Sequence, residues 1–557
     1  MSSPDIPSNG PSDGARFSRR FLDLTTLALV VALGLLGGFL MHRYPARFFG
    51  ADWLTNEHGN QLYRAQVIGA GGHLYRDVEC QYGPLPVYAF AAFAKWAGDT
   101  VQAGCAFHLL VSLVAVAAMF RWLARAARSG RELLLLAGLL GVASLCLTAF
   151  FRSPLLLALG ANFEYLGFER LWLIGLAAGW RPPRERGMRD ALRLGLFFLL
   201  WQLTKFGGGA FGVAAFFAVD IAYLLTVGDG ADRRAVIRFW VLGPAACVGA
   251  EALRAAMFYA VLDPDIATRS LWPLWLIGFY PYDRLHIWID WRHFLTYIAP
   301  IAIPALAGFA ISAAWLLVKA RTAMSSRLPV ALWFPVMVPL AFYLGGSIDK
   351  VGYFGREWLF FQYAFALMPA MLLLAIRTPR ILGLGLAFCA YGTSALMFLR
   401  SAGWKPSPDP VRFETPVGPV WESATNADMR IWQAAQAWTD ARPGSRLVVF
   451  SRWSGGGWYA ARKTHAPLRN TLFVHGARTG PDDTQLDAVL PQVDLIVCQV
   501  EDLQGDLPSS VRSERAGKEI AGFLPPALAR RVMDEYVLAE TDPRATGWLL
   551  LRRRAMK

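Results

Sequence analysis

Charged residues and cysteines are both scarce in this sequence. Only 17% of its 557 residues are charged, whereas about a quarter are charged in an average soluble protein. Hydrophobic residues make up 55% of the chain, and the mean hydropathy is +0.35. This composition excludes an ordinary soluble protein and predicts a polytopic membrane protein.

The six cysteines are scattered, and no CxxC pair or Cys/His cluster occurs. This pattern indicates neither a zinc site nor a disulfide framework. Secondary transporters typically contain internal repeats. The sequence shows no internal repeat. The absence of a repeat favours other classes of membrane protein over transporters.

Lysine and arginine give the chain a net charge of +14, but they gather at the ends of apolar segments. A nucleic-acid-binding protein would cluster them on one face, so no nucleic-acid partner is expected. Arginine-rich loops recur at alternate connections, and the positive-inside rule assigns these loops and the N-terminus to the cytoplasm. A long first outer loop, residues 42–100, then lies on the opposite side of the membrane.

The first 400 residues divide into a tail and a membrane domain. Residues 1–20 are rich in Ser, Pro and Gly, and we expect a disordered cytoplasmic N-terminus. The apolar run 21–41 is too long for a signal peptide and predicts a retained span. A single helix over 190–227 would be about 57 Å long, nearly twice the bilayer core, so the glycines at 207–209 are expected to divide it.

About 11 spans are expected between residues 21 and 400, which places the C-terminus outside. Their ranges are 21–41, 101–120, 134–151, 166–180, 190–204, 208–227, 238–262, 293–318, 330–345, 358–376 and 381–399.

After residue 400 the composition changes. Residues 401–419 are a Pro-rich linker, and residues 420–557 alternate polar stretches with short apolar runs. Helical periodicity follows a cap signal at Asn426, and the runs "RLVVF", "TLFVHG", "VDLIVCQV" and "WLLLRR" suit buried strands. The predicted fold is therefore a polytopic α-helical membrane protein with a C-terminal soluble α/β domain in the periplasm or outside the cell.

The first outer loop concentrates the polar chemistry in "TNEHGNQLYRAQVIGAGGHLYRD". We expect a short interfacial helix over 60–68 that stops at the glycines of 69–72. Glu57 would precede this helix, and Asp77 would follow its turn. A carboxylate near a helix N-terminus stays ionised, which suits a base or a metal ligand. Residues 83–97 are too short to span comfortably and predict a surface or re-entrant helix.

The residue pattern "NE-HG…YRAQ…G…LYRD…YGPL" resembles the first-loop motif of the GT-C superfamily of membrane glycosyltransferases. That superfamily includes protein O-mannosyltransferases, the lipid A aminoarabinose transferase and lipopolysaccharide-core sugar transferases. Asn56 and Glu57 fall on its acidic pair, Tyr63 on the following helix, and Tyr75 and Asp77 on its "Y.D" element. The many-span body and the outward C-terminal domain extend the resemblance over nearly the whole chain.

The resemblance implies inverting transfer of a sugar from a polyprenyl-phosphate donor to an acceptor hydroxyl on a lipid, glycan or protein. The reaction would take place on the outer face of the plasma membrane, in contact with membrane lipids, and needs a base, for which Glu57 is the first choice, then Asp77 or Asp52. The first acidic position is Asn56, however, and Glu164 is the nearest acid in the second outer loop. The metal ligands are unknown, and the resemblance leaves open whether a divalent cation is a cofactor.

A departing lipid phosphate calls for cations, because its negative charge grows in the transition state. Arg356, in "KVGYFGREWLFFQY", matches a late arginine element of the family, and Tyr63 and Tyr75 are further substrate-binding candidates. Weaker phosphate candidates are Lys205, Arg269, Arg284 and Arg292.

Each candidate also has a structural interpretation. Glu57 could simply be solvated, Asp77 could cap a turn, and Arg356 could anchor the interface. "SGGGW" at Ser454 lacks the lysine of a phosphate-binding loop and is interpreted as an ordinary loop.

Two other functions stay open at this point. A lipid-linked polysaccharide polymerase or ligase uses similar donors but usually has a large loop between late spans. A secondary transporter would need ionisable residues at mid-membrane, for which Asp220, Glu251 and Arg254 are available.

Overall fold

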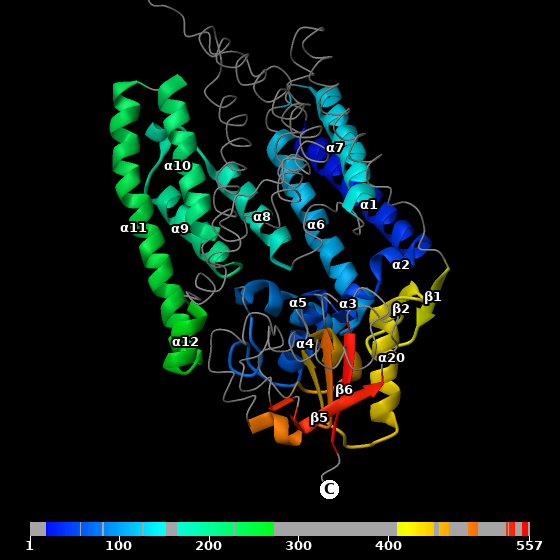
Figure 1. Ribbon diagram of the computed structural model, residues 1–557. Helices are drawn as coiled ribbons and strands as arrows, with labels where there is room; N and C mark the ends of the chain where they lie inside the picture. Colours follow the sequence, from blue (N-terminus) through cyan, green and yellow to red (C-terminus); the bar gives the residue numbers. More distant parts are fainter. Residues whose placement is uncertain are drawn as a thin grey trace, which may run out of the picture.

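A computed structural model shows a helical body above a layer of short helices and strands (Figure 1). The residues that it describes are 18–55, 57–80, 83–124, 127, 129–151, 164–205, 208–226, 229–271, 409–450, 456–466, 488–499, 531–532, 534–540 and 548–554.

Seven helices of the body coincide with predicted spans. They are α1 (Arg19–Arg43), α6 (Val101–Ala124), α7 (Gly130–Phe151), α8 (Glu164–Gly179), α9 (Met188–Gln202), α10 (Gly208–Thr226) and α11 (Gly230–Val261). The separation of α9 from α10 agrees with the expected break at the triple glycine. The four predicted spans after residue 292 lie outside the described residues, so the number of spans stays a prediction.

Three of these helices, α1, α6 and α11, contain stretches long and apolar enough to cross a membrane. Along α1, exposed apolar side chains recur at Leu24, Leu27, Val31, Leu35 and Phe39, which form one stripe. A stripe of this length would be unstable in water, and it suits contact with lipid. The composition of the helices and this stripe indicate a membrane location.

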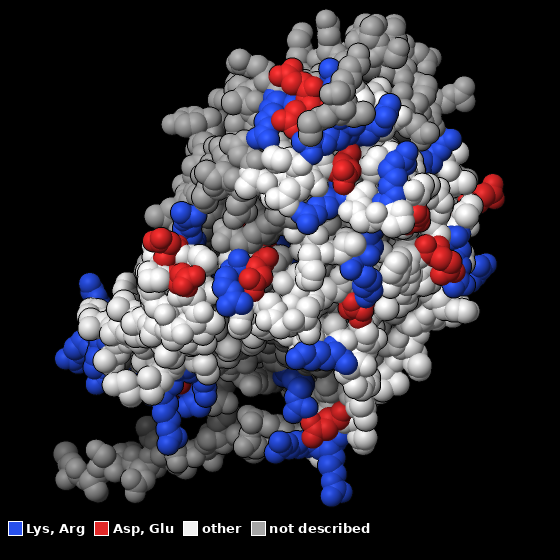
Figure 2. All heavy atoms as spheres, turned by 90° about the horizontal axis from the view of Figure 1, so that it is seen from below, with Lys and Arg blue, Asp and Glu red and all other residues white. Residues whose placement is uncertain are grey.

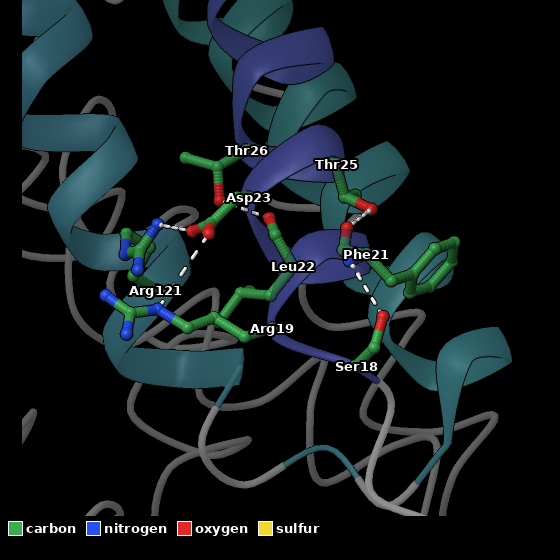
Figure 3. Close-up of polar contacts among 8 residues, drawn as sticks. All are labelled: Ser18, Arg19, Phe21, Leu22, Asp23, Thr25, Thr26 and Arg121. Atoms are coloured by element: carbon green, nitrogen blue, oxygen red, sulfur yellow. Dashed lines mark hydrogen bonds and ion pairs between the residues drawn. The ribbon is translucent and has the colours of Figure 1, made fainter.

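Polar side chains at the start of α1 find partners within the body (Figure 3). Thr25 and Thr26 each donate a hydroxyl hydrogen bond of 2.7 Å to the carbonyl four residues earlier. Asp23 pairs with Arg121 of α6 at 2.5 Å. These contacts satisfy polar groups in an apolar helix and join the first residues of α1 to the last turn of α6.

A buried ion pair joins α10 to the segment before α9. Arg186 donates to both oxygens of Asp220, and their side chains are 1% and 0% exposed. Asp220 also accepts hydrogen bonds from the indoles of Trp180 and Trp240, at 2.9 and 3.2 Å. Because these partners neutralise Asp220, it does not offer a free charge for a transporter. Glu251 and Arg254 likewise pair with each other, at 2.6 Å.

The short helices of the first outer loop lie beneath the body. They are α2 (Pro45–Phe48), α3 (Asp52–Thr55), α4 (Glu57–Gly69) and α5 (Pro84–Ala97), and α12 (Pro264–Leu271) follows α11. The helix predicted over 60–68 is thus confirmed as α4. Glu57 begins this helix, so the expectation that Glu57 would precede it is wrong by one turn. The reason is that the helix includes Gly59, a residue that disfavours helices, at a position where close packing against Gly457 requires glycine.

The described residues from 409 onward form two sheets with helices. In the first, β1 (Pro410–Phe413) pairs antiparallel with β2 (Val420–Ser423). The second has the order β3-β4-β6-β5, in which only the β3–β4 pair is parallel. Its bounds are β3 (Leu447–Phe450), β4 (Leu495–Gln499), β5 (Tyr536–Glu540) and β6 (Trp548–Arg553).

Sequence signals account for part of this arrangement. Helix α20 (Ala427–Asp440) begins where the cap signal predicts, because the Asn426 side chain accepts from the Met429 amide. Three predicted strands match β3, β4 and β6, while "TLFVHG" lies outside the described residues. Two features differ from the predictions: β1 falls within the predicted linker, and Gly456 and Gly457 open helix α21 (Gly456–Arg462) instead of lying in a loop.

The segment after 409 packs on the same end of the body as the first outer loop. The Trp421 amide donates to the Phe49 carbonyl at 2.7 Å, and the Val101 amide donates to the Val417 carbonyl at 2.9 Å. Figure 2 shows basic and acidic side chains interspersed on the face seen from below, without one basic patch. The outer loop and the C-terminal segment therefore form one continuous layer.

Candidate functional site

Helix α4 is held against α21 by direct backbone contact. A Cβ atom on Gly59 would lie 2.3 Å from the Gly457 Cα atom, and a Cβ on Gly457 would lie 2.4 Å from the Leu54 carbonyl oxygen. Only glycine allows this approach. The contact fixes the first turn of α4, where Glu57 begins the helix, against the C-terminal segment.

A buried polar cluster lies beneath α4. Gln61 is fully buried, and its side-chain oxygen accepts a hydrogen bond of 2.8 Å from Nε2 of His108 on α6. The Trp53 ring stacks on His108 and also contacts His58, with ring centroids 5.9 and 5.2 Å away. The Gln61 side-chain nitrogen has no hydrogen-bond partner in the described part of the chain. One end of this amide therefore stays polar and unpaired next to the first turn of α4.

Arg64 and Tyr75 extend this buried layer toward α11. Arg64 is 2% exposed and donates to the Glu79 carbonyl at 3.2 Å. The Tyr75 ring packs on Phe258 with centroids 5.5 Å apart, and burial raises the Tyr75 pKa well above its usual value. Arg254 of α11 lies in the same region and contacts the Phe258 ring. In this arrangement Tyr75 serves as a packing residue, and its substrate contact stays a prediction.

Asp77 occupies an exposed turn. Its carboxylate accepts from the His73 amide at 2.7 Å and pairs with Arg76 at 2.9 Å. The hydrogen bond from Arg76, followed by that from the His73 amide, lowers the Asp77 pKa. These are the contacts of a turn cap, which was the structural interpretation of this residue. A role for Asp77 as the base stays a prediction.

The "YGPL" element docks on the end of α9 and brings Lys205 to the outer loop. The Gly83 amide donates to the Thr204 carbonyl at 2.9 Å, and the Leu85 amide donates to the Leu203 carbonyl at 2.8 Å. A Cβ on Gly83 would lie 2.1 Å from the Leu203 carbonyl oxygen, so this position requires glycine. Lys205, which is half-buried, follows directly after these two residues.

The other predicted site residues fall into two groups. Asp52 and Glu57 lie in adjacent short helices, Glu164 begins α8, and Arg269 is exposed in α12. The side chains of Asp52, Glu57 and Glu164 and all of Arg284, Arg292 and Arg356 lie outside the described residues.

Tyr63 lies on α4, and its hydroxyl accepts from the Ala466 amide at 2.7 Å. Burial raises the Tyr63 pKa. This hydrogen bond ties α4 to the segment after α21, a role that the sequence pattern did not predict. Sequence reasoning also missed Gln61 and His108, because they are 47 residues apart and meet only across two helices.

Within the described residues, no group of three or more His, Cys, Asp or Glu side chains is close enough to hold a metal ion. The side chains of Asp52, Glu57 and Glu164 lie outside that set, so a divalent cation as cofactor stays a prediction.

No protein-family model and no curated protein matches the chain by sequence. Among solved structures, the oligosaccharyltransferase of Archaeoglobus fulgidus matches with a TM-score of 0.51 and 13% identity, over 93% of this chain and 71% of that chain. ArnT from Cupriavidus metallidurans, bound to undecaprenyl phosphate, matches with a TM-score of 0.48 and 10% identity over 96% and 98%. The first match shows that the predicted resemblance to GT-C glycosyltransferases is correct at the level of the fold.

Proposed function

We propose that this chain is an inverting glycosyltransferase that acts on the outer face of the plasma membrane and moves a sugar from a polyprenyl-phosphate donor to an acceptor hydroxyl. The observation that carries the proposal is the position of α4. This helix begins at Glu57 and is clamped between the membrane helices and the C-terminal segment, in a chain that shares the fold of an oligosaccharyltransferase over 93% of its length.

Glu57 is the proposed base. The partial positive charge of a helix N-terminus favours its ionised form, which can take the proton of the acceptor hydroxyl. The acceptor oxygen then forms a bond to the anomeric carbon from the face opposite the phosphate. The bond from that carbon to the phosphate oxygen breaks, and the lipid phosphate departs with the electron pair. Attack from the opposite face inverts the configuration.

Lys205 is the described cation that best suits the departing phosphate. Its main chain lies beside the first outer loop because the Gly83 and Leu85 amides bind the two residues before it. A positive charge near the phosphate oxygens stabilises the charge that develops as the bond breaks. Arg356 is proposed as a second cation on the basis of its sequence match alone.

The unpaired amide nitrogen of Gln61 gives the buried layer beneath α4 a further role. Its partner His108 holds the Gln61 oxygen, so the nitrogen has a defined direction. A buried donor without a partner costs free energy, which a substrate oxygen or an ordered water would recover. This layer is proposed to position α4, and Gln61 and His108 are therefore positioning residues.

The test is a transfer assay on the purified full-length chain in lipid nanodiscs. Undecaprenyl-phosphate sugars with different head groups are offered with glycan and lipid acceptors, and the labelled product is measured. Glu57→Gln should lower the rate about 10²–10⁴-fold, which is the usual contribution of a general base.

Glu132→Gln is the matched control, because Glu132 lies in the first turn of α7 at the opposite end of the body. Its rate should equal that of the wild type. An unchanged rate in correctly folded Glu57→Gln would show that Glu57 is not the base, and Asp52→Asn and Asp77→Asn would then identify the alternative. No transfer by wild type from any lipid-linked donor would contradict the proposed reaction.

A further inference from the structure

A pocket of about 380 Å³ opens between the first outer loop and the turn after α21. This volume lies within the range of small-molecule sites. Three parts of the chain form its walls, namely the second half of α4, the end of α5, and residues 463–465.

Three polar contacts hold these walls together. Gln66 donates a hydrogen bond to the Ala460 carbonyl at 3.2 Å, and the Tyr63 hydroxyl accepts from the Ala466 amide at 2.7 Å. Lys463 forms an ion pair with Asp99 across the pocket. Because both sides are tied to each other, the pocket is formed before a ligand arrives, which reduces the entropy cost of binding.

The charges on the pocket wall favour an anion. Among the described residues of the lining, Asp99 is the only acidic one, and Lys463 already pairs with it. Lys95 is exposed on the lining and makes no ion pair with any described residue. The lining therefore carries a lysine whose charge no described acid balances, and His465 is also part of the lining.

Part of the pocket lining is apolar and made of small residues. It includes Ala65, Ala91 and Ala94, while Gly69 and Gly98 lie at helix ends. Small side chains leave room for a sugar ring, and the Tyr63 hydroxyl and Gln66 amide of the lining suit hydroxyl groups. Among the described residues, the lining thus combines small apolar side chains, hydrogen-bonding groups and a lysine without an ion-pair partner.

We propose that this pocket binds an acidic sugar unit of the acceptor, a ring that carries a carboxylate or a phosphate, with Lys95 contacting the anion. Its use in catalysis rests on the proposed glycosyl transfer. Gln66 lies about 13 Å along α4 from Glu57, at 1.5 Å per residue. The bound unit would therefore be separated along the acceptor from the hydroxyl that reacts, and the pocket would select acceptors that carry an acidic sugar at that separation.

The first test measures binding without any donor, so that it does not depend on transfer. Glucuronic acid, glucose 6-phosphate, glucose and inorganic phosphate are titrated into the full chain in detergent, and affinity is measured by calorimetry and ligand-observed NMR. The two acidic sugars should bind at least about tenfold more tightly than glucose or phosphate alone, since each combines a charged hydrogen bond with ring contacts.

Variants distinguish the contribution of the Lys95 charge from that of the pocket's shape. Lys95→Gln should weaken the acidic sugars about tenfold or more and leave glucose unchanged, and Lys95→Arg should retain binding. Gly69→Leu should weaken all three sugars by filling the pocket, since a Cβ there meets nothing within 4 Å. Arg234→Gln, which removes an exposed cation from α11 far from the pocket, is the control and should change nothing.

Three outcomes would overturn the proposal. Equal affinity for phosphate and glucose 6-phosphate would show a plain anion site. An unchanged affinity in Lys95→Gln would place the ligand elsewhere. Competition by phosphatidylglycerol vesicles, with no binding of soluble acidic sugars, would assign the pocket to a lipid headgroup. Binding of acidic sugars without any sugar transfer would contradict the proposed function but support the proposed binding site.

Discussion

Two clusters of buried polar side chains in this molecule differ in how completely they are paired. At α10, Asp220 accepts hydrogen bonds from Arg186, Trp180 and Trp240. Beneath α4, Gln61 binds His108 through one atom, and its nitrogen has no partner in the described part of the chain. A saturated ion pair holds helices together, whereas the unpaired Gln61 donor on α4 leaves the capacity for one more hydrogen bond.

The largest effect should come from breaking the saturated cluster. Asp220→Asn leaves Arg186 buried without a counter-charge, and we expect a loss of about 3–5 kcal/mol in the free energy of unfolding. Thermal unfolding in detergent measures it, and a loss below about 1 kcal/mol would show that water reaches the arginine.

The next effect should arise where α4 meets α21. A Cβ in Gly457→Ala would lie 2.4 Å from the Leu54 carbonyl oxygen, so we expect a loss of about 1–3 kcal/mol and slower transfer. Gly249→Ala is the control, since a Cβ there meets nothing within 4 Å. The control should be neutral or more stable by about 0.5–1 kcal/mol, because alanine favours a helix. Equal stability of the two variants would rule out a tight contact.

In the cluster of Gln61 and His108, one substitution and two substitutions should change the free energy of unfolding differently. His108→Leu leaves both ends of the Gln61 amide unpaired and should cost about 1–3 kcal/mol. The double variant with Gln61→Leu should recover much of the stability but not the transfer rate, because the hydrogen bond that positions α4 is lost. A double variant with full activity would show that the cluster is only structural.

Tyr63→Phe removes the hydroxyl that accepts from the Ala466 amide and should cost about 1 kcal/mol at neutral pH. Because burial raises the Tyr63 pKa, this residue stabilises the fold below the unfolded pKa of about 10 and loses that contribution as pH rises through its folded pKa. The variant should therefore lose less stability than wild type between pH 10 and 12 in chemical denaturation. A steeper loss would contradict this sign.

The smallest effect is expected at the start of α1. Asp23→Asn breaks a half-exposed pair with Arg121 and should cost less than about 1 kcal/mol, because solvent screens it. Unfolding of wild type and variant at low and high salt measures the contribution of this ion pair to stability. A loss as large as that of Asp220→Asn would mean that the pair is not solvated.

Local signals were sufficient for many elements. The length of the apolar run predicts α1, the glycines at 69–72 predict the end of α4, and the Asn426 cap predicts α20. Strand β5 was not predicted because Tyr536–Glu540 is a short run with a single β-branched residue and a charge at its end, and its pairing with β6 includes a register shift. Local pattern identifies an element where the residues themselves prefer that conformation.

By itself, the sequence determined the membrane class, the positions of seven helices and a carboxylate-containing loop between the first two of them. Only the tertiary structure decided that α4 rests on α21 through glycines, that His108 meets Gln61, and that Lys95 faces residues 463–465 across a pocket. The physical reason is the sequence separation over which each interaction acts, since apolar periodicity and helix caps involve residues only a few positions apart. Hydrogen bonds between distant residues depend on how whole helices pack, which no short stretch of sequence encodes.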